Sequence, residues 1–295
     1  MDVGLFVSTT GPMLTGPDLA ATARAAEERG FHSLWVAEHI VFFDRLGSKP
    51  PFSERSSLVA GEYGLFDPFA ALAYLACATE RIRLGTGVAI APQRNPVQTA
   101  KLAATIDHLS GGRLDLGLGL GWVREEFESL EVPYPARGRR NDSYLRVMRS
   151  LWEEDPSACE TPHYRLPPCR HWPKPVQSPL PVHVGGNGDG AIRRAAQWGN
   201  GWYAFNLGPE ELRERVARLE AELDRVGRAR REIRVNVCGY LRPVDRDTML
   251  RYAEAGADQL ILFAMDVQPA NRDERLDAYA ATFLPRTRPL AEAPR

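Results

Sequence analysis

Long hydrophobic runs are absent from this chain of 295 residues. No segment approaches the roughly 18 uninterrupted apolar residues that a membrane-spanning helix needs. The opening stretch, MDVGLFVSTTG, also lacks the basic region and apolar run of a secretory signal. We therefore expect a soluble protein that stays in the cytoplasm and has no membrane partner.

An excess of charge of one sign is also missing, because 37 basic residues are balanced by 38 acidic ones. The formal net charge of −1 gives no global field that would attract nucleic acid or an acidic membrane surface. The four cysteines are scattered without paired spacing, as is typical of reduced cytoplasmic thiols. His163, Cys169 and His171 do not match the spacing of a zinc module, so we expect no metal site.

The most informative stretch that is present runs from Arg81 to Trp122. Residues 81–90 are rich in aliphatic and β-branched side chains and predict a strand that Pro92 stops. Residues 97–109 predict a helix that buries Leu102, Ile106 and Leu109 on one face. Residues 113–120 predict a second strand that is apolar on both faces, which is typical of a parallel strand covered on both sides.

Glycine is frequent inside or at the ends of these two predicted strands, where it weakens strand pairing and usually marks a bulge or the close approach of another group. The residues are Gly85, Gly87, Gly117, Gly119 and Gly121. Neighbouring strands without side chains could offer a flat surface to a planar ligand. The same glycines could instead relieve crowding inside a barrel, and the spacing alone leaves both explanations open.

Over its whole length the chain alternates predicted strands with helices, and every connection is too long for a hairpin. This pattern predicts one (β/α)8 TIM barrel spanning residues 1–295 as a single domain. An open Rossmann sheet is disfavoured, because no G-x-G-x-x-G follows the first strand. The expected strands are 3–8, 33–37, 81–90, 113–120, 181–185, 201–205, 233–241 and 259–264.

Two connections stand out by length and composition. Residues 40–67, after the second strand, form a long loop with five aromatic residues, which favours contact with a ligand. Residues 156–181, before the fifth strand, contain eight prolines, which keep the backbone extended and exclude a helix. Of the expected helices, the first is capped by Asp18, and residues 124–131 form a charged, solvated one.

The active site of a (β/α)8 barrel lies where the strands end at their carboxyl edge. His39 follows the second strand directly beside Glu38, and an imidazole there is a plausible general acid or base. Trp122 follows a glycine-rich strand and is either a core ring or a wall against a planar ligand. A serine hydrolase has little support, because no G-x-S-x-G motif surrounds Ser8.

A second candidate site is the turn Gly185-Gly186-Asn187-Gly188-Asp189-Gly190, which lies between a predicted strand and helix. Successive glycines let backbone N–H groups converge, and the start of the helix adds about half a positive charge. Together these features favour a phosphate over a plain connecting turn.

The run ATERIRLGTGVAIAPQRNPVQTAKLAATIDHLSGGRLDLGLGLGWVREEFESLEVPYPARGRR, followed by PKPVQSPLPVHVGGNGDGAIRRAAQWGNGWY, resembles the bacterial luciferase-like monooxygenase superfamily. It is most similar to the branch of F420-dependent oxidoreductases, and the early LWVAEH also fits. The resemblance implies a (β/α)8 barrel that binds coenzyme F420 or a flavin at its carboxyl mouth. It also implies a homodimer.

Carried over residue by residue, the resemblance makes His39 the active-site histidine. It places a non-prolyl cis peptide at Gly87-Val88, behind the cofactor ring and directly after Thr86. The segment Gly185 to Asn187 would hold the cofactor phosphate. Asp107 and Arg113 would fix a turn by an ion pair. Trp122 departs from the pattern, because some relatives have a catalytic glutamate there.

We therefore expect an oxidoreductase in which F420 exchanges a hydride with a small organic substrate. His39, with Glu38, is the predicted catalytic group, and the cofactor is predicted to contact Thr86, Gly87, Val88, Trp122 and the turn from Gly185 to Asn187. One alternative is an FMN-dependent monooxygenase, in which reduced flavin reacts with dioxygen. Another is a non-catalytic relative that binds flavin without turnover.

Overall fold

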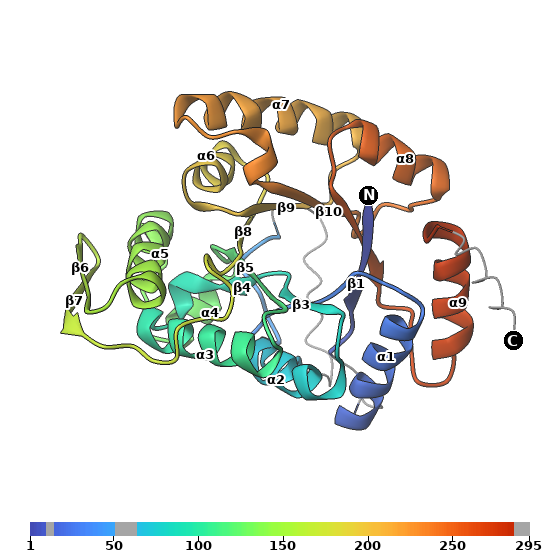
Figure 1. The fold of residues 1–295 in the computed structure, drawn as a ribbon, viewed down its shortest axis with the longest axis horizontal. Coiled ribbons are helices and arrows are strands. Elements are labelled where there is room, and N and C mark those ends of the chain that lie inside the picture. The colour runs from blue at the N-terminus through green and yellow to red at the C-terminus, as the bar shows by residue number, and fades with distance from the viewer. Residues whose placement is uncertain (10–14, 51–63, 286–295) are drawn as a thin grey trace, which may run out of the picture.

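The computed structural model describes residues 1–9, 15–50 and 64–285. Eight parallel strands close into a barrel that helices surround (Figure 1). The barrel closes because β1 pairs with both β2 and β11, while β3 pairs with β5. The predicted (β/α)8 barrel is thereby confirmed. The barrel strands are β1 (Asp2–Val7), β2 (Ser33–Val36), β3 (Arg83–Thr86), β5 (Leu114–Gly119), β8 (Val182–Gly185), β9 (Gly201–Phe205), β10 (Arg234–Cys238) and β11 (Gln259–Ala264).

Within the described residues, no helix combines the length and apolar character needed to span a membrane. Two short 3-10 turns, η1 (Ala91–Gln93) and η2 (Arg230–Glu232), accompany the helices. The helices are α1 (Gly16–Glu28), α2 (Pro68–Ala78), α3 (Pro96–Leu109), α4 (Arg124–Ser129), α5 (Arg137–Glu153), α6 (Asp189–Trp198), α7 (Pro209–Arg225), α8 (Arg246–Glu254) and α9 (Arg272–Phe283).

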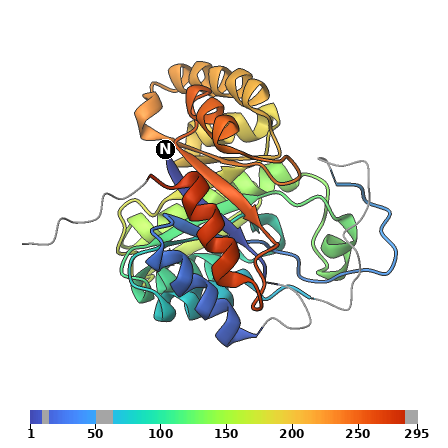
Figure 2. The same cartoon turned by 90° about the vertical axis from the view of Figure 1, so that its right-hand side faces the viewer.

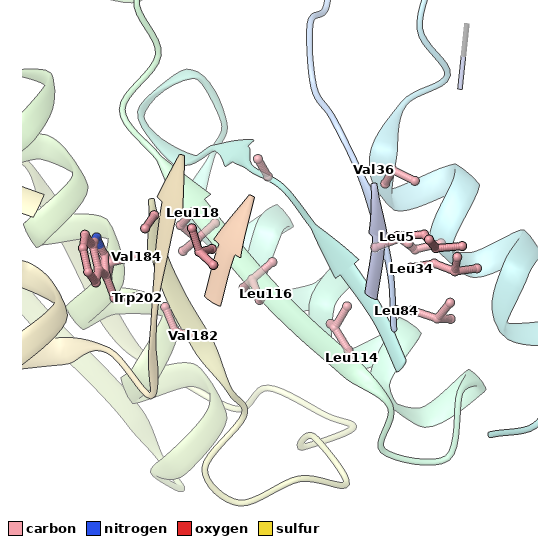
Figure 3. Close-up of a cluster of buried hydrophobic side chains, with 14 of the residues drawn as sticks. Leu5, Leu34, Val36, Leu84, Leu114, Leu116, Leu118, Val182, Val184 and Trp202 are labelled. Atoms are coloured by element: carbon pink, nitrogen blue, oxygen red, sulfur yellow. The ribbon is translucent and has the colours of Figure 1, made fainter. Parts of the chain in front are cut away.

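The hydrophobic core lies between the outward faces of the strands and the helices. Aliphatic side chains such as Leu5, Leu116 and Val184 line this layer (Figure 3). The prediction for α3 is wrong in its details, because Leu102 and Leu109 are 40% and 53% exposed. The face of α3 that packs inward consists mainly of alanines and Ile106, and small side chains let the helix lie close to its neighbours.

Two predicted local features differ from the structure. Thr15 caps α1, and Asp18 lies in the first turn, where its carboxylate accepts hydrogen bonds from the backbone N–H and hydroxyl of Thr15. Asp107 and Arg113 make separate contacts: Asp107 accepts two hydrogen bonds from Gln177, while the Arg113 guanidinium donates to backbone carbonyls at the end of α2. Asp107 and Arg113 are both buried, and these hydrogen bonds offset the cost of burying their charges.

The proline-rich connection contains no helix, as predicted, but it forms an unexpected hairpin. Strands β6 (Ser157–Thr161) and β7 (Tyr164–Cys169) pair antiparallel and lie against α5 at the edge of the molecule (Figure 1). The chain then returns across α3 and α5. Lys174 donates to backbone carbonyls of Leu151 and Glu154 at the end of α5, which fixes the returning segment.

His171 in this returning segment gives a prediction about acid stability. The side chain is 4% exposed, and burial lowers its pKa below 6.5, with a further lowering by the ammonium groups of Lys101 and Lys174. The unfolded chain therefore binds a proton near pH 6.5 that the folded protein does not bind. The free energy of unfolding is fully retained above about pH 6.5 and falls as the pH drops toward the folded pKa.

We expect His171→Leu to flatten the fall in thermal midpoint between about pH 7.5 and pH 5. The exposed residue His163 on the hairpin supplies a control, His163→Leu, which should retain the wild-type slope. Part of the decrease of the thermal midpoint with falling pH should persist in both variants, because burial also lowers the pKa of His32. A wild-type slope in His171→Leu would contradict the prediction.

The barrel interior is filled below its carboxyl end. Five side chains, Phe6, Trp35, Tyr203, Cys238 and Ile261, pack together across the middle. These side chains fill the middle of the barrel and form a plug. A ligand can therefore enter only the part of the barrel at the carboxyl ends of the strands.

A polar layer lies below the plug. Asp115 accepts hydrogen bonds from Arg83 and from His183 Nε2, and Asn236 contacts the other ring nitrogen of His183 at 2.8 Å. Burial alone would raise the pKa of Asp115, but the bonds from His183 and Arg83 outweigh burial and hold this pKa well below its usual range. The carboxylate is therefore charged and paired inside the barrel.

Candidate active site at the carboxyl end of the barrel

The third strand is interrupted where the sequence predicts one continuous strand. After β3 the peptide bond between Gly87 and Val88 is cis, and a short strand, β4 (Ala89–Ile90), continues the barrel beside β5. The cis peptide expected from the resemblance is thus present. The interruption forms a bulge at the carboxyl end of the barrel, and both of its residues are half-buried.

The glycines of the neighbouring strands make room for this bulge. A Cβ added at Gly119 of β5 would lie 2.5 Å from Val88 Cγ2, and one added at Gly185 of β8 would lie 2.9 Å from Val88 Cγ1. Val88 therefore covers the surface that the glycines leave open. We call Gly87, Val88, Gly119 and Gly185 the Val88 platform.

Glycines deeper in the barrel are explained by internal packing. A Cβ at Gly85 would lie 2.4 Å from the Trp35 ring, and one at Gly117 would lie 1.9 Å from the carbonyl oxygen of Thr86. Thr86 itself is buried and donates its hydroxyl to the Gly117 carbonyl at 2.6 Å. Of the two explanations that the sequence left open, relief of crowding accounts for these positions.

The opposite side of the barrel mouth carries a group of aromatic rings. Tyr240 stands 4.5 Å from Phe205 and 4.6 Å from Phe263, measured between ring centroids, and Phe263 contacts Phe6 at 5.3 Å. These residues come from β1, β9 and β11 and from the chain just after β10. We call Phe6, Phe205, Tyr240 and Phe263 the aromatic wall. It gives the mouth an apolar side, and its rings belong to or pack against the same buried cluster that Val88 contacts.

His39 lies at the mouth with partners on several sides. Its ring centroid is 5.8 Å from that of Phe42 and 6.2 Å from that of Trp122, which is half-buried. Its Nδ1 atom lies 3.1 Å from a carboxylate oxygen of Glu126. The structure therefore brings together two residues that the sequence predicted for the site, His39 and Trp122.

Glu38 is adjacent to His39 in sequence but makes different contacts. Its carboxylate accepts hydrogen bonds from the Arg94 guanidinium and from the backbone N–H of Ile90, and its side chain is 1% exposed. Burial alone would lower the pKa of Arg94, but Glu38 and Asp67 outweigh burial and raise it. Both oxygens of Glu38 are occupied, which favours a role in holding the strand end over proton transfer.

Glu126 is a site residue that the sequence pattern did not indicate. The run containing it, REEFES, predicts a solvated helix, but in α4 the side chains of Glu126 and Phe127 are buried. Its position in the chain could have indicated Glu126, because α4 begins only a few residues after β5 ends, at the edge of the barrel where the site lies. A phenylalanine inside a charged run also indicated that part of this helix faces the protein.

Helix α4 also fixes the chain that follows β2, and Figure 2 shows the two at the same end of the molecule. Glu125 accepts hydrogen bonds from the backbone of Gly47 and from the backbone and hydroxyl of Ser48. Burial alone would raise the pKa of Glu125, but these bonds together outweigh burial and hold this pKa at about 2. Residues Phe52 and Tyr63 of the predicted aromatic loop lie outside the described residues.

The turn after β8 leads into the start of α6. Gly186 has φ +115°, a conformation that side chains disfavour. The Asn187 side chain exchanges two hydrogen bonds with the backbone of Phe205, at 2.6 and 3.1 Å, so it ties the turn to β9. A Cβ added at Gly188 would meet no atom within 4 Å, which leaves open space beside the turn.

Two helices begin next to one another at this turn. The Arg194 guanidinium lies 2.6 Å from a Cβ placed at Gly138, in the first turn of α5, and 3.4 Å from one placed at Gly190, in the first turn of α6. Neither helix has a side-chain N-cap. Helix starts carry N–H groups without intrahelical partners and a partial positive charge, so this arrangement favours an anion.

The geometry assembles three functional parts at one end of the barrel. They are the Val88 platform, the glycine turn into α6 that shares Gly185 with it, and a histidine held beside Trp122. Across residues 1–9, 15–50 and 64–285, no three His, Cys, Asp or Glu side chains gather as metal ligands do. The arrangement suits a flat, phosphate-bearing cofactor and proton transfer at His39.

A sequence model of the luciferase-like monooxygenase family matches residues 1–293. An uncharacterised protein of Mycobacterium tuberculosis is 32% identical over 273 residues, which are 92% of this chain and 94% of the relative. Another protein of that organism, provisionally named a coenzyme F420-dependent oxidoreductase, is 31% identical over 55% of this chain and 54% of its own. The crystal structure of a monooxygenase from Streptomyces bottropensis superposes with a TM-score of 0.79 at 21% identity, over 97% of this chain and 99% of that one. The chain therefore belongs to the luciferase-like monooxygenase family, whose members are oxidoreductases and monooxygenases.

Proposed function

We propose that this protein is an oxidoreductase that uses coenzyme F420 to move a hydride to or from a small organic substrate. The observation that carries the proposal is the contact between the Val88 platform and the turn into α6, which share Gly185. A flat ring fits the first and a phosphate fits the second. The Mycobacterium tuberculosis relative named for F420 supports the same cofactor.

The residues present fit such a group. Gly87 and Val88 would support the ring, and backbone N–H groups around Gly188 would hold the phosphate. The Arg194 guanidinium, which also pairs with Asp142, would assist them. When bound, F420 would donate a hydride in its reduced form or accept one in its oxidised form. His39 would hold or release the proton that accompanies that transfer.

The aromatic wall indicates the kind of substrate. Rings of Phe205, Tyr240 and Phe263 contact one another along one side of the mouth. Apolar or aromatic molecules gain most from such a surface, because their burial removes apolar area from water. We therefore propose a small substrate with an apolar body and one polar carbon centre near His39.

The cofactor assignment is tested by titrating the purified apo-protein with F420 and, separately, with FMN. We expect F420 to bind with a Kd of about 1–10 μM and FMN to bind at least roughly tenfold more weakly. Ring absorbance or fluorescence reports binding in both cases. The reverse preference would overturn the F420 assignment and favour an FMN-dependent monooxygenase, and failure of both cofactors to bind would remove the mechanism.

Two matched arginine variants locate the phosphate in the same titration. Arg194→Gln should weaken F420 binding about tenfold, because a charge-assisted contact is lost. Arg170→Gln is the control, since Arg170 follows β7 and pairs with Asp155. The β6–β7 hairpin lies apart from α6 (Figure 1). Tight binding of F420 with no turnover of any apolar alcohol, ketone or aldehyde would favour the non-catalytic alternative.

A further inference from the structure

Glu126 is a buried carboxylate that directly contacts the candidate active-site histidine. Its side chain is 2% exposed. One oxygen, Oε1, lies 3.1 Å from His39 Nδ1 and accepts the backbone N–H of Ile40 at 3.0 Å. The other, Oε2, accepts the side-chain amide of Gln93 at 3.3 Å. Burial of this group is compensated by three separate partners.

These contacts bear on which ring nitrogen of His39 carries the proton. The backbone N–H of Ile40 can only donate, so Oε1 acts as an acceptor at this point. An ionised carboxylate accepts from all of its neighbours, and His39 Nδ1 must then be a donor. In the neutral ring, the other nitrogen, Nε2, is then left without a proton. Free imidazole carries no such constraint, because either nitrogen can hold the proton.

We propose that Glu126 is a positioning residue that holds His39 in the form protonated at Nδ1, so that Nε2 is the atom that accepts the substrate proton. The catalytic part of this inference rests on the proposed function, whereas the proton position does not. When Nε2 accepts a proton the ring becomes cationic, and the carboxylate beside Nδ1 offsets that charge. Glu126 also ties Ile40, and hence the chain after β2, to α4.

The proton position is tested without cofactor or substrate. The full chain is labelled with 15N-histidine, and the two ring nitrogens are observed by long-range 1H–15N NMR at about pH 8, above the ordinary histidine pKa. Loss of one signal set in His39→Asn assigns His39. The wild type should show the Nδ1-protonated pattern, and Glu126→Leu should shift His39 toward the Nε2-protonated pattern.

Activity provides the second readout. Glu126→Leu should lower kcat about 10- to 100-fold and change the Kd for F420 less than about twofold, because it acts through His39 and not on the cofactor. Glu126→Gln keeps an acceptor oxygen and should recover most of kcat and the wild-type tautomer. Glu128→Gln is the matched control, since Glu128 lies in the same helix but is exposed.

The outcomes separate this inference from the proposed function. An Nε2-protonated His39 in the wild type, or an unchanged pattern in Glu126→Leu, overturns the inference whatever the cofactor. If Glu126→Leu does not fold, the wild-type pattern still tests the inference, and Gln93→Leu is the control variant that should leave the His39 pattern unchanged. If F420 does not bind, the proposed function fails, and the NMR result still decides the role of Glu126.

Discussion

Replacing His39 with alanine should lower kcat by about 10²- to 10⁴-fold, the usual contribution of a positioned general acid or base. The ring stands at the barrel mouth beside Trp122 and is held by Glu126. The Val88 platform and the turn into α6 do not depend on it. The Kd for F420 should therefore stay within about twofold of the wild type, because the loss falls on proton transfer and not on cofactor binding.

Steady-state kinetics together with an F420 titration check this result. His163→Ala is the control, because His163 is an exposed histidine in the hairpin, away from the barrel mouth. Wild-type turnover in His39→Ala would refute His39 as the proton-transfer group and favour a role in substrate contact. A parallel loss of F420 affinity would place His39 against the cofactor instead.

Replacing Asp115 with alanine should lower the free energy of unfolding by about 3–5 kcal/mol, the usual cost of breaking a buried ion pair on one side. Asp115 accepts from Arg83 at 2.7 and 2.8 Å and lies 3.2 Å from His183. The variant leaves a guanidinium and an imidazole inside the barrel without their acceptor. Urea unfolding, followed by circular dichroism, measures the loss.

Glu210→Ala is the matched control for Asp115→Ala. It breaks the ion pair with Arg251, in which both side chains are more than half exposed, and exposed pairs often contribute nothing measurable. We expect its urea midpoint to equal that of the wild type. If Asp115→Ala unfolded at the same urea concentration as the wild type, the polar layer would not be a source of stability.

The same residue types have different roles in different surroundings, and this limits what the sequence could predict. Glu38 and Glu126 are both buried at the barrel mouth, yet Glu38 is neutralised by Arg94 while Glu126 contacts His39. Sequence position indicated Glu38, because it is the neighbour of His39. The chain places Glu126 next to His39 only when α4 folds over the barrel mouth.

The glycine-rich strands show the same limit. Their spacing indicated an unusual surface at the carboxyl end of β5, and the resemblance indicated a cis peptide at Gly87-Val88, which the structure contains. The sequence could not show that Val88 covers Gly119 and Gly185, or that Gly85 makes room for Trp35. Those contacts join strands that are far apart along the chain.

The sequence by itself determined the barrel, the order of its strands and the edge where a site belongs, because the alternation of apolar segments and the turn residues are local signals. It also determined which histidine and which glycine turn to consider. Only the tertiary structure decided the partners of those residues: Glu126 for His39, Arg94 for Glu38, and Phe205 for Asn187. Hydrogen bonds and burial depend on which distant segments meet, and closure of the barrel brings those segments together.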